Sequence, residues 1–264
     1  MIITDDTTYR SHPCPSFSTL KHILTSPLHY QAALRKPVEQ SKAMLLGSML
    51  HSRVLENKEY PVAVMPRDLD GRTKEGRAWK EANAGRDVIS SDEHDQYKRM
   101  VAACDKNADL QYLLKKCDMR EVGIVTKYRG LELKGKLDAS GIDEAGNRFI
   151  LDLKSSQSAD PFEFGRSASS MKYFMQMCLY TTLLSLELKL ESEPAWFWVV
   201  CENSEAADVC IFQPPQDAIE IGRAQLNRAV DLYIECSTSG KWPGRGNGIL
   251  ELEISPFERR KWIK

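Results

Sequence analysis

The sequence lacks long apolar runs, and this absence argues against a helical membrane protein. No stretch of the 264 residues approaches the roughly eighteen consecutive apolar side chains that a spanning helix needs. The N-terminal segment MIITDDTTYRSHPCP carries acidic groups where a secretory signal needs basic and then apolar residues. We therefore expect no membrane span and, by default, a cytoplasmic location.

Closely paired cysteines are also missing. The seven cysteines are scattered and odd in number, and no two of them have C-x-x-C spacing. This pattern argues against a zinc ribbon and against a disulfide framework, so most of the thiols are expected to be reduced. The residues are Cys14, Cys104, Cys117, Cys178, Cys201, Cys210 and Cys236.

An excess of basic charge is absent as well. The chain has 36 Lys and Arg residues against 37 Asp and Glu residues, which gives no global attraction to nucleic acid. Any site for a polyanion must therefore be a local concentration of cations, because salt confines electrostatic fields to about 8–10 Å. Internal repeats and low-complexity linkers are missing too.

The first half of the chain has mostly helical patterning. Ser18 is a plausible cap for one short helix, and Ser26-Pro27 supplies a cap and a first helical position for the next. Ser91 is expected to cap a later helix. The predicted helices cover residues 16–35 (two short helices), 41–56 and 91–117, with a loop-rich stretch around Pro61 and Pro66 and a charged segment, 67–82, between the last two.

The periodicity changes after residue 117. Three strand candidates follow one another, and the segments YRG and DEAGN supply turns between them. A helix, two strands and a further helix complete the order, which predicts an α/β or α+β fold with a central mixed sheet flanked by helices. The predicted strands are 121–128, 131–142, 148–155, 195–202 and 208–213, and the predicted helices are 171–188 and 215–237.

The third of these strands, RFILDLKS, places two charged residues in a run that otherwise suits the core. If its hairpin turn centres on Ala145, residues whose numbers sum to 290 face each other. Asp138 then lies across from Asp152, with the two Cβ atoms roughly 5 Å apart. Strand alternation keeps Lys154 beside Asp152 and sends three leucines to the opposite face. These are Leu137, Leu151 and Leu153.

Two carboxylates so close repel each other unless a cation lies between them. Oxygen ligands in this arrangement suit Mg²⁺ or Mn²⁺, and an adjacent lysine can orient a water molecule or neutralise charge in a phosphoryl transition state. The alternative is a solvated strand face with a cross-strand Asp–Lys pair. Spacing alone does not decide between them.

Four motifs in the expected order resemble the PD-(D/E)xK nuclease superfamily and its RecB-like branch. Asp138 and the segment LDLK match the acidic pair and the lysine, GSMLH (47–51) matches G-x-x-x-H, and QMCLY (176–180) matches Q-x-x-x-Y. The segments HPCPSFSTLKHILTSPLHYQ, RTKEGRAW and SGKWPG add a resemblance to the exonuclease VIII (RecE-type) nuclease domain. Lambda exonuclease is similar more distantly.

This resemblance implies a restriction-endonuclease-like core with a helical N-terminal region, in one nuclease domain over residues 1–264. Residues 1–117 would be its mostly helical part, 118–240 its catalytic core and 241–264 its tail. The implied activity is Mg²⁺-dependent 5′→3′ digestion of double-stranded DNA ends, with Mn²⁺ as a substitute. It would leave 3′ single strands for an annealing protein, and a ring of three or four subunits is implied.

The resemblance also implies roles for the residues of the hairpin. Asp138 and Asp152 are expected to bind one or two metal ions, with the Leu153 carbonyl as an additional oxygen ligand. Lys154 would position or help to activate the attacking water.

Further roles concern residues outside the hairpin, and each has a plainer alternative. His51 is expected near the metal, or else it is a core histidine. Gln176 and Tyr180 would contact the scissile strand or hold the site, or they form an ordinary helix face. Glu121 would reach a second metal, although glutamates at strand ends are usually solvated.

Arg72, Lys74, Arg77 and Lys80 would contact phosphates along the duplex or at its 5′ end. A solvated charged helix is the alternative, because acidic residues dilute the run. Two rival functions also remain open. One is a different nuclease of the superfamily, structure-specific or acting on single strands. The other is a catalytically silent module that binds DNA ends or loads a recombinase.

Overall fold

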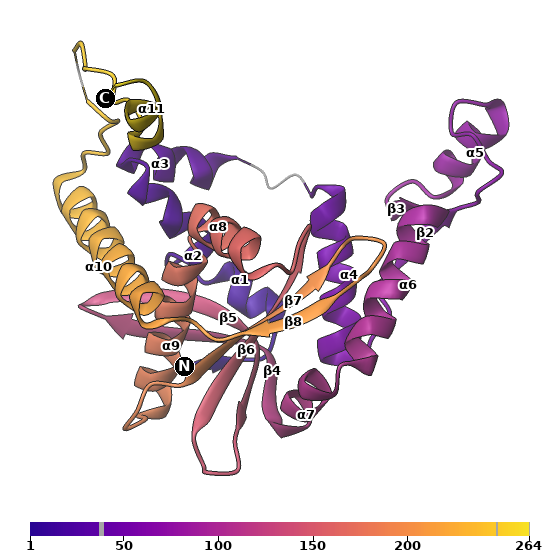
Figure 1. Ribbon diagram of the computed structural model, residues 1–264, viewed down its shortest axis with the longest axis horizontal. Helices are drawn as coiled ribbons and strands as arrows, with labels where there is room; N and C mark the ends of the chain where they lie inside the picture. The colour runs from indigo at the N-terminus through magenta and orange to yellow at the C-terminus, as the bar shows by residue number, and fades with distance from the viewer. Residues whose placement is uncertain (37–39, 247, 264) are drawn as a thin grey trace.

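The computed structural model describes residues 1–36, 40–246 and 248–263 (Figure 1). Within these residues, six strands form one sheet in the order β1-β4-β5-β6-β7-β8. β6 and β7 are parallel and the other neighbours antiparallel, so the predicted mixed sheet is confirmed. The strands are β1 (Ile2–Ile3), β4 (Cys117–Tyr128), β5 (Leu131–Ile142), β6 (Arg148–Ser156), β7 (Ala195–Glu202) and β8 (Val209–Phe212).

Helices cover both faces of this sheet. The helices are α1 (Asp6–Ser11), α2 (Phe17–Leu20), the 3-10 helix η1 (Lys21–Leu24), α3 (Pro27–Arg35), α4 (Lys42–Glu56), α5 (Lys74–Ala82), α6 (Ser91–Lys106), α7 (Ala108–Lys116), α8 (Pro161–Met171), α9 (Tyr173–Leu188), α10 (Gln216–Ser239) and α11 (Pro256–Trp262). A separate parallel pair, β2 (Val62–Met65) and β3 (Asp87–Ser90), lies beyond α4.

Two apolar clusters divide between the faces of the sheet. On one face, α9 and α10 pack with α2, η1 and α8 against side chains such as Ile150 and Trp198. On the other face, α4, α6 and α7 pack against Leu151, Leu153 and Val199. α9 is apolar on nearly all sides and its residues from Met175 to Leu184 are buried, because it lies between the sheet and α10.

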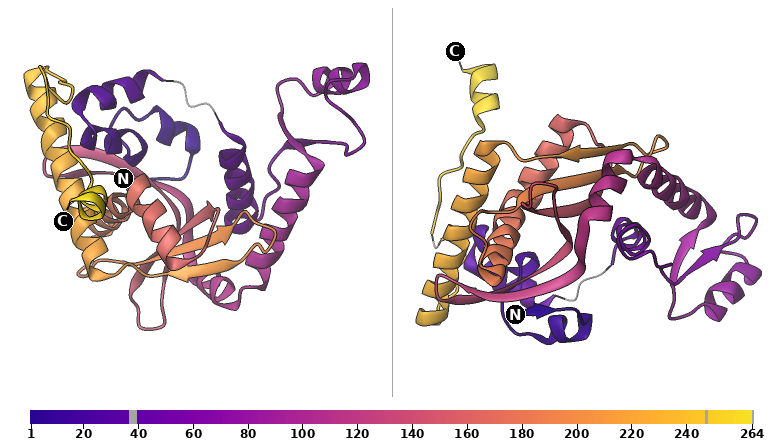
Figure 2. Two further views of the ribbon diagram at one scale, coloured as in Figure 1. Left: turned by 45° about the horizontal axis from the view of Figure 1, so that its top comes forward. Right: turned by 90° about the horizontal axis from the view of Figure 1, so that it is seen from below.

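Two arms project from this core (Figures 1 and 2). One contains β2, β3, the outer part of α6 and, at its far end, α5. The other contains α3, α10 and the C-terminal tail with α11. None of the described helices is both long enough and apolar enough to span a membrane. All seven cysteines are unpaired thiols, as predicted.

The predicted helix over 91–117 is wrong in one respect, since it is divided at Asn107. The Asn107 backbone is extended, and its side chain accepts a hydrogen bond from the Leu110 amide as the cap of α7. The same side chain donates to the carbonyl of Val209 in β8. The start was also misplaced by one residue, because Ser90 and Glu93 form a capping box.

Short elements were missed. Strands β1, β2 and β3 and helices α1, α8 and α11 were not predicted, and α2 is capped by Ser16 rather than Ser18. For α8 the signal was present in the sequence, because Asp160 caps it and Pro161 opens it. The caps Ser26 and Ser41 were recognisable, and both accept the expected backbone hydrogen bonds.

The predicted register of the β5–β6 hairpin is confirmed. Every paired couple in the ladder sums to 290: Ala139 with Leu151, Ser140 with Ile150, Gly141 with Phe149, and Ile142 with Arg148. The ladder ends at Ala139, so Asp138 and Asp152 lie just beyond its last pair.

The predicted face of Leu137 is wrong. Leu137 packs in the cluster under α9, whereas Leu151 and Leu153 pack under α4. The change of face coincides with a break in the β4–β5 ladder, which skips the couple Glu121 and Asp138. Glu121 has a left-handed backbone with φ of 52°, so the strand is locally irregular beside Asp138.

Candidate active site

Asp152 and Lys154 form a buried ion pair on β6. The Lys154 Nζ lies 2.6 Å from Asp152 Oδ2, and Asp152 is only 1% exposed. Gln176, one turn into α9, donates to the other Asp152 oxygen at 3.3 Å. The ring of Tyr173 lies against the Lys154 ammonium at 4.9 Å. The predicted proximity of these two charged residues is therefore present, and α9 holds both of them.

Asp138 lies directly beside this pair. Its Oδ2 accepts a hydrogen bond from the backbone N–H of Leu153, at 2.8 Å, between the two charged residues of β6. The carboxylate of Asp138 also raises the pKa of Asp152, which shows that the two acids interact. The hairpin therefore brings Asp138, Asp152 and Lys154 together.

His51 of α4 joins this group through both ring nitrogens. Nε2 lies 2.7 Å from the Leu153 carbonyl, and since a carbonyl only accepts, Nε2 carries the hydrogen. Nδ1 then faces Glu121 Oε1 at 3.6 Å and Asp138 Oδ2 at 3.7 Å. His51 is therefore a site residue and not an isolated core histidine.

Glu121 is held in place by a lysine that the sequence analysis missed. Lys136 Nζ lies 2.9 Å from Glu121 Oε2 and 3.0 Å from Asp6 Oδ1 of α1. Strand alternation offered a signal, because Lys136 is two residues before Asp138 on β5. Tyr173 was also missed, although it lies three residues before Gln176 on the same helix face.

The charges of this cluster shift one another's titration. Burial raises the pKa of Asp152 to about 6, with Lys154 opposing and Asp138 adding to the rise. Burial alone would lower the pKa of His51, but the carboxylates of Asp138 and Glu121 outweigh it and raise the value to about 9. Burial likewise opposes the charge on Lys154, yet Asp152 and Asp138 raise its pKa. His51 and Lys154 are therefore cationic at neutral pH.

Two glycines permit this packing. A Cβ added at Gly47 would lie 3.3 Å from the Ser155 hydroxyl, so glycine lets α4 approach β6 closely and places His51 one turn later. At Gly135 an added Cβ would lie 2.8 Å from the ring of Tyr180. Tyr180 is 8% exposed and packs on β5, beneath the surface of the site.

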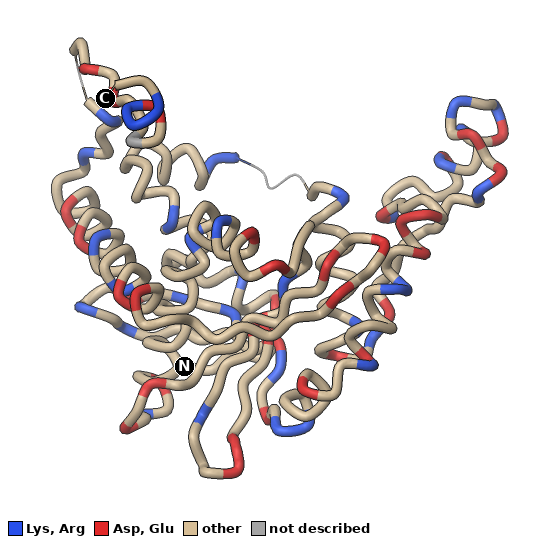
Figure 3. The backbone as a smooth tube through the Cα atoms, in the orientation of Figure 1, with Lys and Arg blue, Asp and Glu red and all other residues tan. Residues whose placement is uncertain are grey.

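The predicted DNA-contact residues lie elsewhere. Lys74, Arg77 and Lys80 lie on α5 at the end of one arm, and Arg72 just before it pairs with Asp70 at 3.0 Å. Figure 3 shows acidic and basic segments alternating in this arm. The structure does not bring these residues to the acidic cluster.

The residues of the cluster fit a divalent ion. One ligand atom from each of His51, Glu121 and Asp138 lies within 4.8 Å of the others. Two buried oxygens nearby, Glu121 Oε1 and Gln176 Oε1, form no hydrogen bond with a described residue. Carboxylate and carbonyl oxygens are the ligands that Mg²⁺ and Mn²⁺ prefer.

A cleft of about 840 Å³ opens onto this cluster. Its lining includes His51, Glu121 and Lys136, together with Arg10 and Tyr60. The cleft therefore reaches the His51 and Glu121 side of the cluster.

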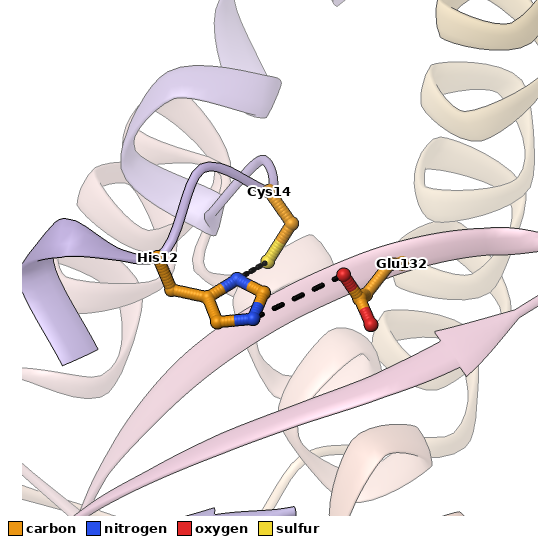
Figure 4. A group of neighbouring side chains, drawn as sticks. All are labelled: His12, Cys14 and Glu132. Atoms are coloured by element: carbon orange, nitrogen blue, oxygen red, sulfur yellow. Dashed lines mark hydrogen bonds and ion pairs between the residues drawn. The ribbon is translucent and has the colours of Figure 1, made fainter. Parts of the chain in front are cut away.

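A second group of potential ligands consists of His12, Cys14 and Glu132 (Figure 4). His12 Nδ1 lies 3.2 Å from Cys14 Sγ, and Nε2 lies 4.0 Å from Glu132 Oε2. The imidazole thus lies between the thiol and the carboxylate, with one nitrogen towards each (Figure 4). Burial raises the pKa of Cys14 to about 11, so the thiol stays protonated. One ligand atom from each residue lies within 4.8 Å of the others, as in the first cluster, but a protonated thiol is a poor metal ligand.

Comparisons with known proteins agree with this fold. A crystal structure of a protein from Eubacterium rectale, provisionally named an exonuclease, matches with a TM-score of 0.61 over 99% of each chain at 15% identity. The match to the crystal structure of SSO0001 covers 71% of this chain and 86% of the SSO0001 chain at 14% identity, but its TM-score of 0.30 supports no argument. No curated protein matches the chain. The profile of one family matches residues 16–253. The chain therefore belongs to the family described as the PDDEXK-like domain of unknown function (DUF3799).

Proposed function

We propose that this protein is a Mg²⁺-dependent exonuclease that digests double-stranded DNA from its ends. The observation that carries the proposal is the cluster in which Asp138, Asp152 and Lys154 lie together at the bend of the sheet. His51 and Glu121 complete it with one nitrogen and further carboxylate oxygens. Acids, a lysine and an open cleft in this arrangement suit phosphodiester hydrolysis.

Family membership supports a nuclease, and the Eubacterium rectale protein of similar fold carries the name of an exonuclease. The finer features rest on the resemblance to the RecE-type domain. They are 5′→3′ direction, 3′ single-stranded products, an annealing partner and a ring of three or four subunits.

In the proposed site, Asp138, Asp152 and Glu121 would hold the ion, with the Leu153 carbonyl as a further ligand. That carbonyl has two lone pairs, so it can accept from His51 and still face an ion. A divalent ion supplies, when bound, Lewis-acid polarisation of the scissile phosphate.

Side chains of the protein would orient the water molecule, stabilise charge on the phosphate and hold the ligand residues in place. Lys154 keeps its proton beside Asp152, so its ammonium can orient a water molecule and stabilise negative charge on the phosphate. Gln176 fixes the second oxygen of Asp152, and Tyr173 limits the movement of Lys154. His51 keeps Leu153 in position through its Nε2–H.

The proposal is tested with linear duplex DNA labelled separately at its 5′ and 3′ ends, with and without Mg²⁺. We expect Mg²⁺-dependent release of the 5′ label as the first product. Asp118→Asn is the control for loss of an acid outside the cluster, and it should digest DNA as the wild type does. Asp118 is an exposed acid on β4 that pairs with Arg148. Binding of DNA ends without any nucleotide release would contradict the proposal and favour a silent end-binding module. Early release of the 3′ label would contradict the direction.

A further inference from the structure

A groove of about 580 Å³ lies on the arm opposite α5. Four separate segments form it: η1 with the turn after it, the residue before α9, the middle of α10, and the tail after α10. Leu24 and Leu232 give it an apolar floor. Three cations lie on its rim, namely Lys172, Arg228 and Arg245.

The charge of this groove is unbalanced. None of its described lining residues carries a carboxylate. Within residues 1–36, 40–246 and 248–263, no acidic group forms an ion pair with Lys172, Arg228 or Arg245. Arg223, earlier on the same helix α10, by contrast pairs with Glu193 at 2.6 Å. In a chain of net charge −1, this groove has the local concentration of cations that a polyanion requires.

The tail that supplies Arg245 is fixed to the core. The ring of Trp242 stacks on Tyr30 at 5.3 Å and meets Tyr233 edge-on. The amide of Leu28 donates to the Pro243 carbonyl at 3.0 Å. The segment SGKWPG therefore has a structural task, which is to hold the end of this groove in place.

One lining residue of the groove is next in sequence to a residue of the acidic cluster. Lys172 immediately precedes Tyr173, whose ring contacts the Lys154 ammonium. η1, which lines the groove, also carries Lys21, whose pKa is lowered by burial and further by the charge of Lys154. A chain of phosphates that reaches Lys154 can therefore continue past Lys172 without meeting an acidic side chain of the groove.

We propose that this groove binds backbone phosphates of the nucleic-acid strand whose scissile phosphate lies at Asp152 and Lys154. The inference rests on the proposed function and adds to it a second contact region. An apolar floor with a cationic rim suits a phosphodiester strand, because sugars and bases can cover the leucines while phosphates meet the cations. The charged segment at α5 is a weaker candidate, because Arg72 is already paired with Asp70.

The test measures DNA binding without cleavage. An internally labelled 20-mer, single-stranded or duplex, is titrated with protein in EDTA at several salt concentrations, and fluorescence anisotropy is recorded. In Arg228→Ala/Arg245→Ala we expect roughly tenfold weaker binding. The slope of log K against log salt should fall by about 1.4 for the single strand and about 1.8 for the duplex.

Two further variants make the result specific. Arg228→Lys/Arg245→Lys keeps both charges and should retain most of the wild-type slope. Lys106→Ala/Lys115→Ala removes two exposed charges near α7 and should leave affinity and slope unchanged. Thermal unfolding of each variant shows whether the fold is intact. Equal affinity and slope in Arg228→Ala/Arg245→Ala and in the wild type would overturn the inference.

Failure of the groove and failure of the proposed function give different results. If the wild type digests duplex DNA with Mg²⁺ but Arg228→Ala/Arg245→Ala binds normally, only the groove is wrong. If the variant binds weakly with a reduced slope but the wild type never releases nucleotides, the groove stands and the nuclease proposal fails.

Discussion

Among the residues that the structure describes, two clusters each combine a histidine with acidic or thiol groups, and they differ in how the ring is used. In the first, His51 gives one nitrogen to a backbone carbonyl and turns the other towards two carboxylates, so three groups face a shared point. In the second, His12 turns one nitrogen towards the Cys14 thiol and the other towards Glu132 (Figure 4). Ligand atoms lie equally close in both clusters, so the difference is chemical: the first offers two carboxylates, whereas the second offers one carboxylate and a thiol that keeps its proton.

The largest expected difference between the clusters is in catalysis. Asp138→Asn and Asp152→Asn should each reduce nucleotide release from linear duplex at saturating Mg²⁺ by about a thousandfold or more, because each removes a charged oxygen ligand. Glu132→Gln, in the second cluster, should digest DNA at the wild-type rate. Initial rates of acid-soluble release measure this. A wild-type rate in Asp138→Asn would remove the first cluster from the mechanism.

Metal affinity should separate the clusters next. Glu121→Gln and His51→Gln are expected to weaken Mn²⁺ binding about tenfold or more, since both atoms face the shared point of the first cluster. His12→Gln and Cys14→Ser should bind Mn²⁺ as the wild type does. Electron paramagnetic resonance of free Mn²⁺ in DNA-free protein gives the affinities. Loss of binding in Cys14→Ser would reverse the assignment of the two clusters.

The pH dependence of the free energy of unfolding, measured in metal-free protein, is a third way to distinguish the two clusters. The pKa of His51 is about 9 in the folded state, above its ordinary 6.5. The stabilisation that charged His51 gives to the folded state is therefore fully present below pH 6.5 and is lost as the pH rises through about 9. The loss should be about 1–3 kcal/mol of the free energy of unfolding. Urea unfolding at pH 6 and pH 9.5 should show it in the wild type and in His12→Gln, and not in His51→Gln.

The smallest effect is expected at Gly47. In Gly47→Ala the new methyl group presses on the Ser155 hydroxyl, which can rotate, so the free energy of unfolding should change by less than about 1 kcal/mol. We expect α4 to shift away from β6 by a few tenths of an ångström. This shift would displace His51 and weaken Mn²⁺ binding severalfold. Ser48→Ala, on the same helix, is the control. Equal Mn²⁺ affinity in the two variants would show that the approach of α4 does not set the site.

The hairpin and its charged residues were predictable because two constraints agreed. The turn 143–147 fixed the register, and apolar alternation fixed the faces up to Ala139. Beyond Ala139 the predicted face of Leu137 was wrong, because nothing in the sequence marks the left-handed backbone of Glu121. Motif similarity identified His51, but its contact with the Leu153 carbonyl depends on how α4 packs against β6.

Charge was the least predictable property. The densest basic segment lies at α5, at the far end of an arm, whereas the groove draws Lys172, Arg228 and Arg245 from three distant parts of the chain. Each of those cations stands alone in its local sequence. Only tertiary packing brings them together, and no local pattern reports it.

The contact of Lys136 with Asp6 has a practical consequence for work with shortened proteins. Through it the first helix buttresses Glu121, and the ring of Tyr9 packs on Gly123, two residues further along β4. A fragment beginning after Ser11 would keep every motif residue and still lose this support. Truncation to aid crystallisation would thus disturb the proposed ion site while every motif residue remained.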